Sequence, residues 1–217
     1  MGLNYVKKNS NMYQFVNATW NPIKGKCMHD CEYCYMKIFK LPELHFDERE
    51  MKTDLGKHNI VFVGSSCDMF AKTVPAEWIE NVLKYCKEFD NQYLFQSKNS
   101  IRFNELIPCF PDNTILGTTI ETNRLFPCMG NAPPPQLRFL PVKFQMKMIT
   151  IEPIMKFDLD KLVVLIRCNT PNWVNIGADS KGHNLPEPSG EKIRELIYEL
   201  QKFTVIKNKS NLERLMK

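Results

Sequence analysis

From residue 60 onward, short apolar runs alternate with longer amphipathic segments. The apolar runs are rich in Val, Ile, Phe and Tyr, which is typical of buried parallel strands. We predict strands at residues 59–63, 92–96, 114–118, 147–151 and 173–176, with an earlier one at 14–18 and a further one at 203–206. The segments between them place apolar residues at helical spacing. We predict helices at residues 75–87, 158–167 and 189–201.

Strands that alternate with helices pair in parallel through crossovers, so the pattern predicts an α/β fold. Six or seven strands are fewer than the eight units of a closed barrel. We therefore predict a partial (βα)6 TIM-like barrel in a single domain over residues 1–217. Within it we distinguish a loop at 22–40, a charged insertion at 41–57, a proline-rich irregular segment at 122–141 and a short C-terminal extension at 202–217.

Composition narrows the class of protein. A content of 43% hydrophobic and 24% charged residues matches an ordinary soluble domain. No run approaches the ~18 apolar residues that a bilayer requires, and the first residues, MGLNYVKKNSNMYQF, lack the apolar centre of a secretory signal. We expect a cytoplasmic protein with no membrane partner. The net charge of +5 fits a phosphate-bearing substrate, but it fits a plain solvated surface equally well.

Three of the eight cysteines crowd into one short segment, the C-x3-C-x2-C run of Cys27, Cys31 and Cys34 after the first predicted strand. In a reducing cytosol, metal or thiol chemistry explains them better than disulfides. Three thiolates on one loop can ligate three irons of a cubane and leave the fourth iron open. The alternative is a zinc site completed by His29 or His45, although structural zinc ligands usually come as two separated pairs.

Polar residues also follow the later predicted strands, at the edge where barrels of this kind place their chemistry. A carboxylate that ends an apolar run needs a partner if it is buried, which makes Glu121 and Glu152 candidates for a site. The full candidate set after these strands is Gly64, Ser65, Ser66, Asp68, Ser97, Lys98, Thr119, Glu121, Asn123, Arg124, Glu152, Gly177, Asp179 and His183.

The cysteine spacing, with an aromatic residue directly after the last cysteine, resembles the defining motif of the radical SAM superfamily. The segments TWNP (19–22), VFVGSSCDMF (61–70), GTTIETN (117–123), IEP (151–153) and NIGADS (175–180) fall at successive strand ends. Together they resemble a compact phage and bacterial branch of that superfamily, distantly similar to spore photoproduct lyase, over residues 14–200. The departure is at 64–68, where many members of the superfamily carry Gly-Gly-Glu.

The resemblance implies a 4Fe-4S cluster on Cys27, Cys31 and Cys34 that binds S-adenosylmethionine. One-electron reduction would then yield a 5′-deoxyadenosyl radical that abstracts a substrate hydrogen. Expected cofactor contacts are Gly64, Ser65 and Ser66 on the methionine ammonium, Ser97 and Lys98 on its carboxylate, Thr119, Glu121 and Asn123 on the ribose, Gly177 on the adenine, and Tyr35 beside the cluster or the adenine. Expected substrate contacts are Asp68, Arg124, Glu152, Asp179 and His183.

Size and general resemblance favour a nucleotide-like small molecule as substrate. The specific prediction is a lyase that releases queuine from queuosine 5′-phosphate, with an external one-electron reductant such as flavodoxin or ferredoxin. One alternative is a radical SAM enzyme acting on nucleic acid, as in photoproduct repair, although no basic run or aromatic stacking platform supports it. Another is a non-catalytic interaction protein that binds zinc or an iron–sulfur cluster.

Overall fold

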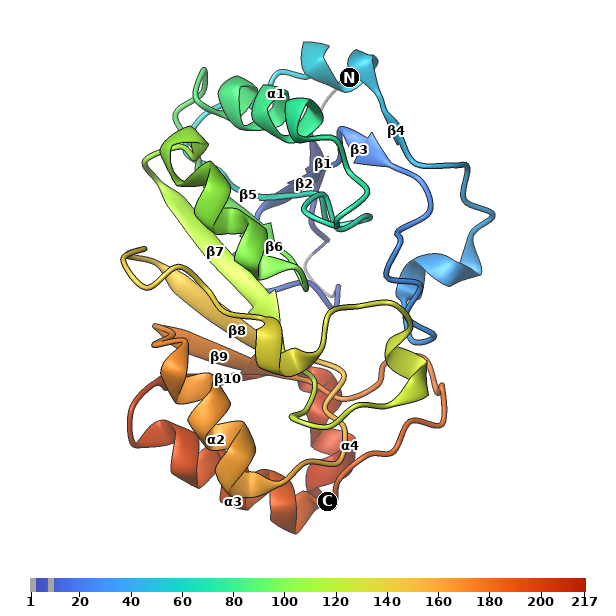
Figure 1. Ribbon diagram of the computed structural model, residues 1–217, viewed down its shortest axis with the longest axis vertical. Helices are drawn as coiled ribbons and strands as arrows, with labels where there is room; N and C mark the ends of the chain where they lie inside the picture. Colours follow the sequence, from blue (N-terminus) through green and yellow to red (C-terminus); the bar gives the residue numbers. More distant parts are fainter. Residues whose placement is uncertain (1–2, 8–9) are drawn as a thin grey trace.

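Eight strands form one curved sheet through the middle of the molecule in the computed structural model, which describes residues 3–7 and 10–217 (Figure 1). In sheet order they are β1 (Asn4–Tyr5), β2 (Ala18–Trp20), β5 (Ile60–Val63), β6 (Gln92–Gln96), β7 (Thr114–Thr119), β8 (Lys147–Ile151), β9 (Trp173–Ile176) and β10 (Val205–Asn208). β1 pairs antiparallel with β2, and every other neighbouring pair is parallel.

From β2 to β10, strands that are consecutive along the chain within this sheet are also neighbours in it. Each crossover therefore adds the next strand on the same side of the sheet. The order ends at β1 on one side and at β10 on the other, and the barrel is therefore open. The predicted α/β class is confirmed, and the sheet is compatible with a TIM-like arrangement. A parallel sheet of this kind brings the carboxyl ends of its strands to one edge, where the loops meet.

The helices predicted at 75–87, 158–167 and 189–201 are confirmed. The predicted set of six βα units is wrong, because the other three crossovers of the parallel sheet contain no α-helix. α1 (Ala76–Cys86), α2 (Leu159–Cys168) and α3 (Gly190–Gln201) follow β5, β8 and β9, and α4 (Glu213–Met216) ends the chain. The other crossovers contain 3-10 turns, several of which include a proline that removes a backbone donor needed by an α-helix. These turns are η1 (Tyr35–Ile38), η2 (Glu48–Lys52), η3 (Ser100–Cys109), η4 (Pro127–Met129) and η5 (Pro135–Leu137), with η6 (Ser210–Leu212) near the C-terminus.

Two predicted strands are shifted along the sequence. The strand predicted at 203–206 forms at β10, two residues later. The strand predicted at 14–18 forms only at β2, and the apolar residues before it fill the concave face of the sheet instead. There Phe15 stacks against the Tyr13 ring at 5.6 Å and meets Trp173 edge-on at 5.5 Å. An open barrel leaves this face uncovered. The apolar residues of 14–18 therefore remove more apolar surface from water by packing on this face than they would at the edge of the sheet.

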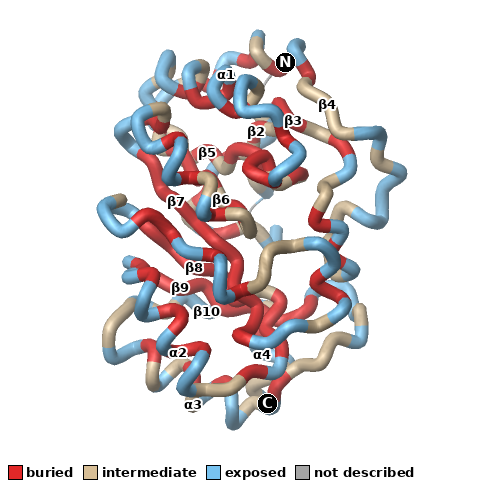
Figure 2. Tube along the Cα trace, in the orientation of Figure 1, coloured by how far each residue is buried: buried red, intermediate tan, exposed pale blue. Residues whose placement is uncertain are grey.

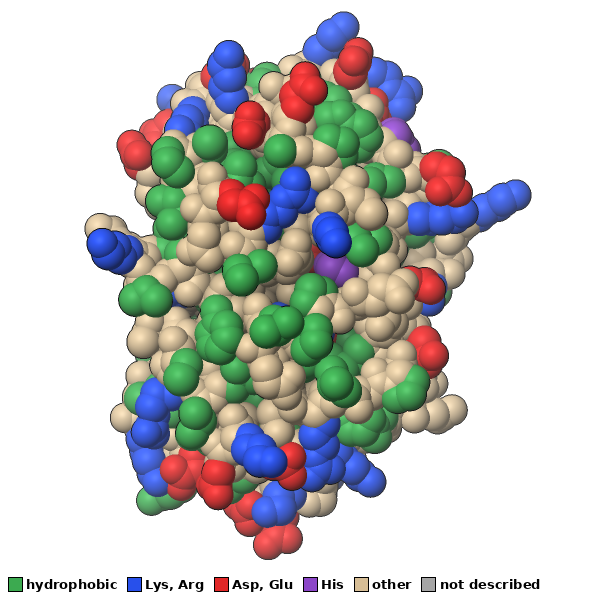
Figure 3. All heavy atoms as spheres, viewed as in Figure 1, with side chains coloured by type: hydrophobic (Ala, Val, Ile, Leu, Met, Phe, Trp, Pro, Cys, Tyr) green, Lys and Arg blue, Asp and Glu red, His purple; other side chains and the backbone are tan. Residues whose placement is uncertain are grey.

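The opposite, convex face of the sheet packs against α1, α2 and α3, and the central strands β7, β8 and β9 are buried at every residue (Figure 2). This arrangement explains why the strands read as continuous apolar runs rather than as alternating ones. No helix in the described part of the chain is long and apolar enough to cross a membrane. Figure 3 shows hydrophobic side chains gathered across the middle of one face, with charged side chains mostly towards the two ends of the molecule.

The charged segment at 41–57 packs into the body of the protein. It forms β4 (His45–Phe46), which pairs antiparallel with β3 (Ile23–Lys24). Lys24 donates to buried Asp47 at 2.9 Å and to Glu50 at 2.6 Å, which ties the two halves of this hairpin together. Because β3 precedes the cysteine motif and β4 follows it, the hairpin fixes both ends of the cysteine loop.

Candidate functional site

A cavity of about 1080 Å³ opens at the carboxyl ends of the parallel strands. Its walls come from the cysteine loop, from the turns after β5, β6, β8 and β9, and from the described N-terminal residues. Cys27, Cys31 and Cys34 all line it. The structure therefore brings the three cysteines of the motif to the edge at which α/β folds place their ligands.

The cysteine loop is folded as consecutive tight turns. The amide of Asp30 donates to the carbonyl of Cys27, and the amide of Cys34 donates to the carbonyl of Cys31. A second segment, the turn at 127–131, holds the loop from outside: the Glu32 amide donates to the Cys128 carbonyl at 2.8 Å. These backbone bonds fix the loop without using the cysteine side chains.

Gly130 is the closest packing point between this turn and the cysteine loop. Its φ of 59° is left-handed, and a Cβ at this position would overlap the backbone of His29 and lie 2.7 Å from the Asp30 carbonyl oxygen. A side chain is therefore excluded by both conformation and space. We expect Gly130→Ala to displace the cysteine loop and to lower iron uptake during reconstitution several-fold.

Gly182 supplies the matched control for this prediction, because its φ of 73° is also left-handed but a Cβ would meet nothing within 4 Å. Gly182→Ala therefore places a methyl group at another positive φ without the overlap. Iron and sulfide content of the two purified variants measures the difference. Equal iron uptake by both variants would contradict the proposed role of the Gly130 contact.

Cys67 is a fourth cysteine at this cavity that the sequence reasoning did not assign. It is buried in the turn after β5 and lies beside Cys27. The hydrogen bond from its thiol, opposed by burial, lowers the pKa of Cys27 to about 6. Its position three residues after Gly64 in the strand-end segment was the available sequence signal.

Asp68 ties together three parts of the site. Its carboxylate accepts from His29 Nε2 at 2.8 Å, from the Ser97 hydroxyl at 3.0 Å and from the Lys98 amide at 2.8 Å. Burial alone would raise its pKa, but His29 and these donors hold the pKa below its usual range. Asp68 thus joins the cysteine loop to the ends of β5 and β6, and its oxygens are occupied by the protein.

Lys98 and Glu121 form a buried polar network with Tyr33 and Arg138. Lys98 Nζ lies 2.7 Å from Glu121 Oε1, and the Tyr33 hydroxyl donates to the same oxygen at 2.6 Å. Arg138 Nη1 donates to Glu121 Oε2 at 2.6 Å, and neither side chain of this pair is exposed. Burial alone would raise the pKa of Glu121, but Lys98 and Arg138 lower it to about 2.

Tyr33 and Arg138 were not singled out from the sequence. Tyr33 lies inside the C-x2-C spacing, where any residue satisfies the motif, and Arg138 lies in the proline-rich segment. The course of such an irregular segment does not follow from its sequence, so the sequence does not indicate which carboxylate an arginine within it contacts. Glu121 itself was noticed because a carboxylate ends an apolar strand, and the structure supplies the partners that such a residue needs.

Seven of the predicted cofactor contacts line the cavity directly: Tyr35, Gly64, Ser65, Ser66, Ser97, Lys98 and Thr119. Asn21, from the TWNP segment, holds the turn after β5, since its side-chain oxygen accepts from the Ser66 amide at 2.9 Å and from the Ser65 hydroxyl at 3.2 Å. The Tyr35 hydroxyl donates to the Ser65 carbonyl at 2.8 Å. These bonds join the last cysteine to the strand-end turn.

Glu152 also faces the cavity. It is paired with Lys209 at 2.6 Å and accepts from Asn211 at 3.0 Å. Gly177 lies behind it, and a Cβ there would sit 2.8 Å from the Glu152 carboxyl carbon, so a side chain at this position would displace the carboxylate. Gly177 therefore makes room for a carboxylate rather than bordering the open space.

Asp179 borders the cavity, but its carboxylate serves the loop that follows β9. It accepts from the Lys181 amide at 3.1 Å and from His183, whose Nδ1 lies 2.7 Å away. These contacts lower the pKa of Asp179 against the opposing effect of burial. The predicted substrate residues Asp179 and His183 thus contact each other.

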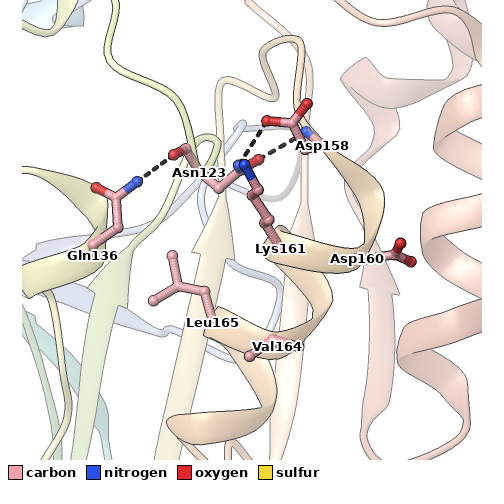
Figure 4. Close-up of a pocket in the computed structure, with 7 residues that line it drawn as sticks. All are labelled: Asn123, Gln136, Asp158, Asp160, Lys161, Val164 and Leu165. Atoms are coloured by element: carbon pink, nitrogen blue, oxygen red, sulfur yellow. Dashed lines mark hydrogen bonds between the residues drawn. The ribbon is translucent and has the colours of Figure 1, made fainter.

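Asn123 lines a separate pocket of about 490 Å³ beside α2 (Figure 4). Asn123 donates to Asp158 at 3.0 Å and accepts from the Gln136 side chain, as the dashed lines in Figure 4 show. Arg124 pairs with the same aspartate. The predicted ribose contact of Asn123 and substrate contact of Arg124 are therefore not among the side chains that the structure gathers around the cysteines.

Residues 10–197 match the family described as "Protein of unknown function (DUF5131)". The chain belongs to this DUF5131 family. No curated protein matches the chain. The fold of this DUF5131 member is similar to a solved structure of spore photoproduct lyase carrying a cysteine-to-serine substitution, with a TM-score of 0.56 at 9% identity, over 94% of this chain and 80% of that chain. At this identity the likeness concerns the fold.

The described cysteines of the motif do not surround a single point. In the described residues, no three His, Cys, Asp or Glu side chains converge closely enough to surround one ion. A zinc site needs such convergence, whereas each thiolate of a cubane binds a different iron. Of the two histidines considered for zinc, His29 contacts Asp68 through Nε2 and His45 contacts the Glu43 carbonyl through Nδ1, so each contact uses only one ring nitrogen.

Proposed function

We propose that this protein is a radical SAM enzyme. The observation that carries the proposal is that Cys27, Cys31 and Cys34 face one cavity at the carboxyl edge of an open parallel sheet. The fold likeness to spore photoproduct lyase supports it. Bound to these thiolates, a 4Fe-4S cluster would supply one electron to S-adenosylmethionine. An external reductant such as flavodoxin or ferredoxin would provide that electron.

The protein's own groups would bind and orient the cofactor. Gly64, Ser65 and Ser66 offer a turn without bulky side chains beside the last cysteine, suited to the methionine ammonium. Thr119 borders the same space at the end of β7, within reach of a ribose. The Tyr35 hydroxyl donates to the Ser65 carbonyl and so links the cysteine loop to this turn.

We propose a nucleotide-like substrate, and specifically queuosine 5′-phosphate with release of queuine. A cavity of about 1080 Å³ is at the upper end for small-molecule sites, so it can hold the cofactor and a second nucleotide-sized molecule. Lys181 at the rim offers a cation for a phosphate, and Glu152 offers a carboxylate for the donors of a base. An oxygen-sensitive cluster and free cysteines suit a reducing cytoplasm.

Anaerobic reconstitution with iron and sulfide tests the proposal in two stages. A brown protein with about four irons per chain that forms 5′-deoxyadenosine from S-adenosylmethionine and dithionite is expected. Addition of queuosine 5′-phosphate should then release free queuine, detected by mass spectrometry. Formation of 5′-deoxyadenosine without queuine would refute the substrate and retain the enzyme class. A colourless protein holding one zinc would refute both.

A further inference from the structure

The ammonium group of Lys98 lies against a cysteine of the motif. Its Nζ is 3.1 Å from the Cys31 sulfur, 2.7 Å from Glu121 Oε1 and 2.9 Å from the Tyr33 hydroxyl oxygen. An ammonium has three N–H donors, and here three acceptors surround it. Lys98 therefore has no donor left for the carboxylate of S-adenosylmethionine, the contact that its sequence position favours.

The position of this ammonium is determined by buried groups. Its side chain is 16% exposed and passes over the Tyr33 ring, with Nζ 4.5 Å from the ring centre. Arg138 holds Glu121 from the other side and also donates to the carbonyls of Thr119 at 2.8 Å and Pro133 at 2.7 Å. Moving Lys98 away would remove one of the two cations that face a fully buried carboxylate, which is strongly unfavourable.

We propose that Lys98 raises the reduction potential of the cluster held by Cys27, Cys31 and Cys34, and that Glu121 and Arg138 position it to do so. The inference rests on the proposed radical SAM function and assigns Lys98 to the cluster rather than to the cofactor carboxylate. Lys98 and Glu121 are positioning residues, because they act on the cluster through the Cys31 thiolate and through each other.

The physical reason is electrostatic. Reduction brings one electron from the external reductant onto the cluster, and the added negative charge is stabilised by a nearby cation. Hydrogen bonds to the ligating sulfur act in the same direction. Because the network is buried, salt screens these interactions little. Glu121 carries the opposite charge, so it must lower the potential that Lys98 raises.

Potentiometric titration of the reconstituted protein, without S-adenosylmethionine and followed by the electron paramagnetic resonance of the reduced cluster, tests this inference. Lys98→Gln keeps a donor but removes the charge, and should lower the ratio of reduced to oxidised cluster at least tenfold at a fixed solution potential, or about 59 mV for one electron. Lys98→Arg keeps the charge and should shift the ratio much less. Glu121→Gln keeps a side-chain oxygen that can accept from Lys98 but removes the negative charge, so it should shift the ratio in the opposite direction, towards reduced cluster.

The opposite signs distinguish an electrostatic effect on the cluster from a general disruption of the site. If Lys98 and Glu121 only stabilised the fold, the two substitutions would not shift the reduction potential in opposite directions. An unchanged potential in Lys98→Gln, or the same direction of shift in both neutral variants, would overturn the inference. If Lys98→Gln takes up no cluster, the test depends on Glu121→Gln alone. A reduction potential in that variant that is not higher than in the wild type would then overturn the inference. A wild-type protein that binds no four-iron cluster refutes the proposed function, and the inference falls with it.

Discussion

Alanine in place of Cys34 should abolish cluster binding, reducing iron content from about four atoms per chain to below about one after reconstitution. The reason is that each thiolate holds a different iron, so two remaining cysteines cannot retain the cubane. Loss of iron should be accompanied by loss of the brown colour and of 5′-deoxyadenosine formation. Colorimetric iron and sulfide assays and the visible spectrum measure the effect.

Cys168→Ala is the matched control for this prediction. Cys168 is exposed at the end of α2, which runs back from the carboxyl ends of the strands towards their amino ends, away from the cysteine loop. This variant should keep the iron content of the wild type. Full iron binding by Cys34→Ala, or equal loss in both variants, would show that the motif does not hold the cluster.

Alanine in place of Arg138 should destabilise the fold by about 3–5 kcal/mol, because it leaves Glu121 buried with one of its two cations removed. The substitution also removes the donors to two buried backbone carbonyls. Urea unfolding of the protein without metal should show a lower midpoint at an unchanged slope. The measurement depends on no cofactor, so it tests the buried network independently of the proposed chemistry.

Arg124→Ala gives the comparison at an exposed pair. Arg124 and Asp158 have side chains that are 43% and 41% exposed, and such pairs contribute about 0–1 kcal/mol. Both variants replace an arginine paired with a carboxylate, in one case a fully buried pair and in the other an exposed pair. Similar losses of stability in the two variants would contradict the account of Glu121 as a buried carboxylate that depends on Arg138.

The cysteine motif and most strands could be predicted because both are local properties of the chain. Cys27, Cys31 and Cys34 lie within eight residues, so their spacing alone restricts the sites they can form. Runs such as 92–96 and 147–151 are too apolar for anything except the buried sheet, and they form β6 and β8 at those residues. Local patterns also account for α1, which begins directly after Pro75.

The misplaced elements have a common cause. The run at 14–18 is as apolar as a strand, yet Tyr13 and Phe15 pack on the concave face because that face is left uncovered by the open barrel. Which apolar surface a segment covers depends on what the other segments leave exposed. The same holds for the crossovers, since prolines forbid an α-helix but do not specify the path that replaces it.

The sequence by itself determined that this protein presents three clustered cysteines after an early strand of an α/β fold, with polar residues at the later strand ends. Only the tertiary structure decided what those polar residues contact. Lys98 reaches Cys31, Asp68 reaches His29, and Asn123 lies at a different pocket. The type of residue at a strand end follows from the chain, but the partner of a charged side chain depends on which segments, distant in sequence, fold against it.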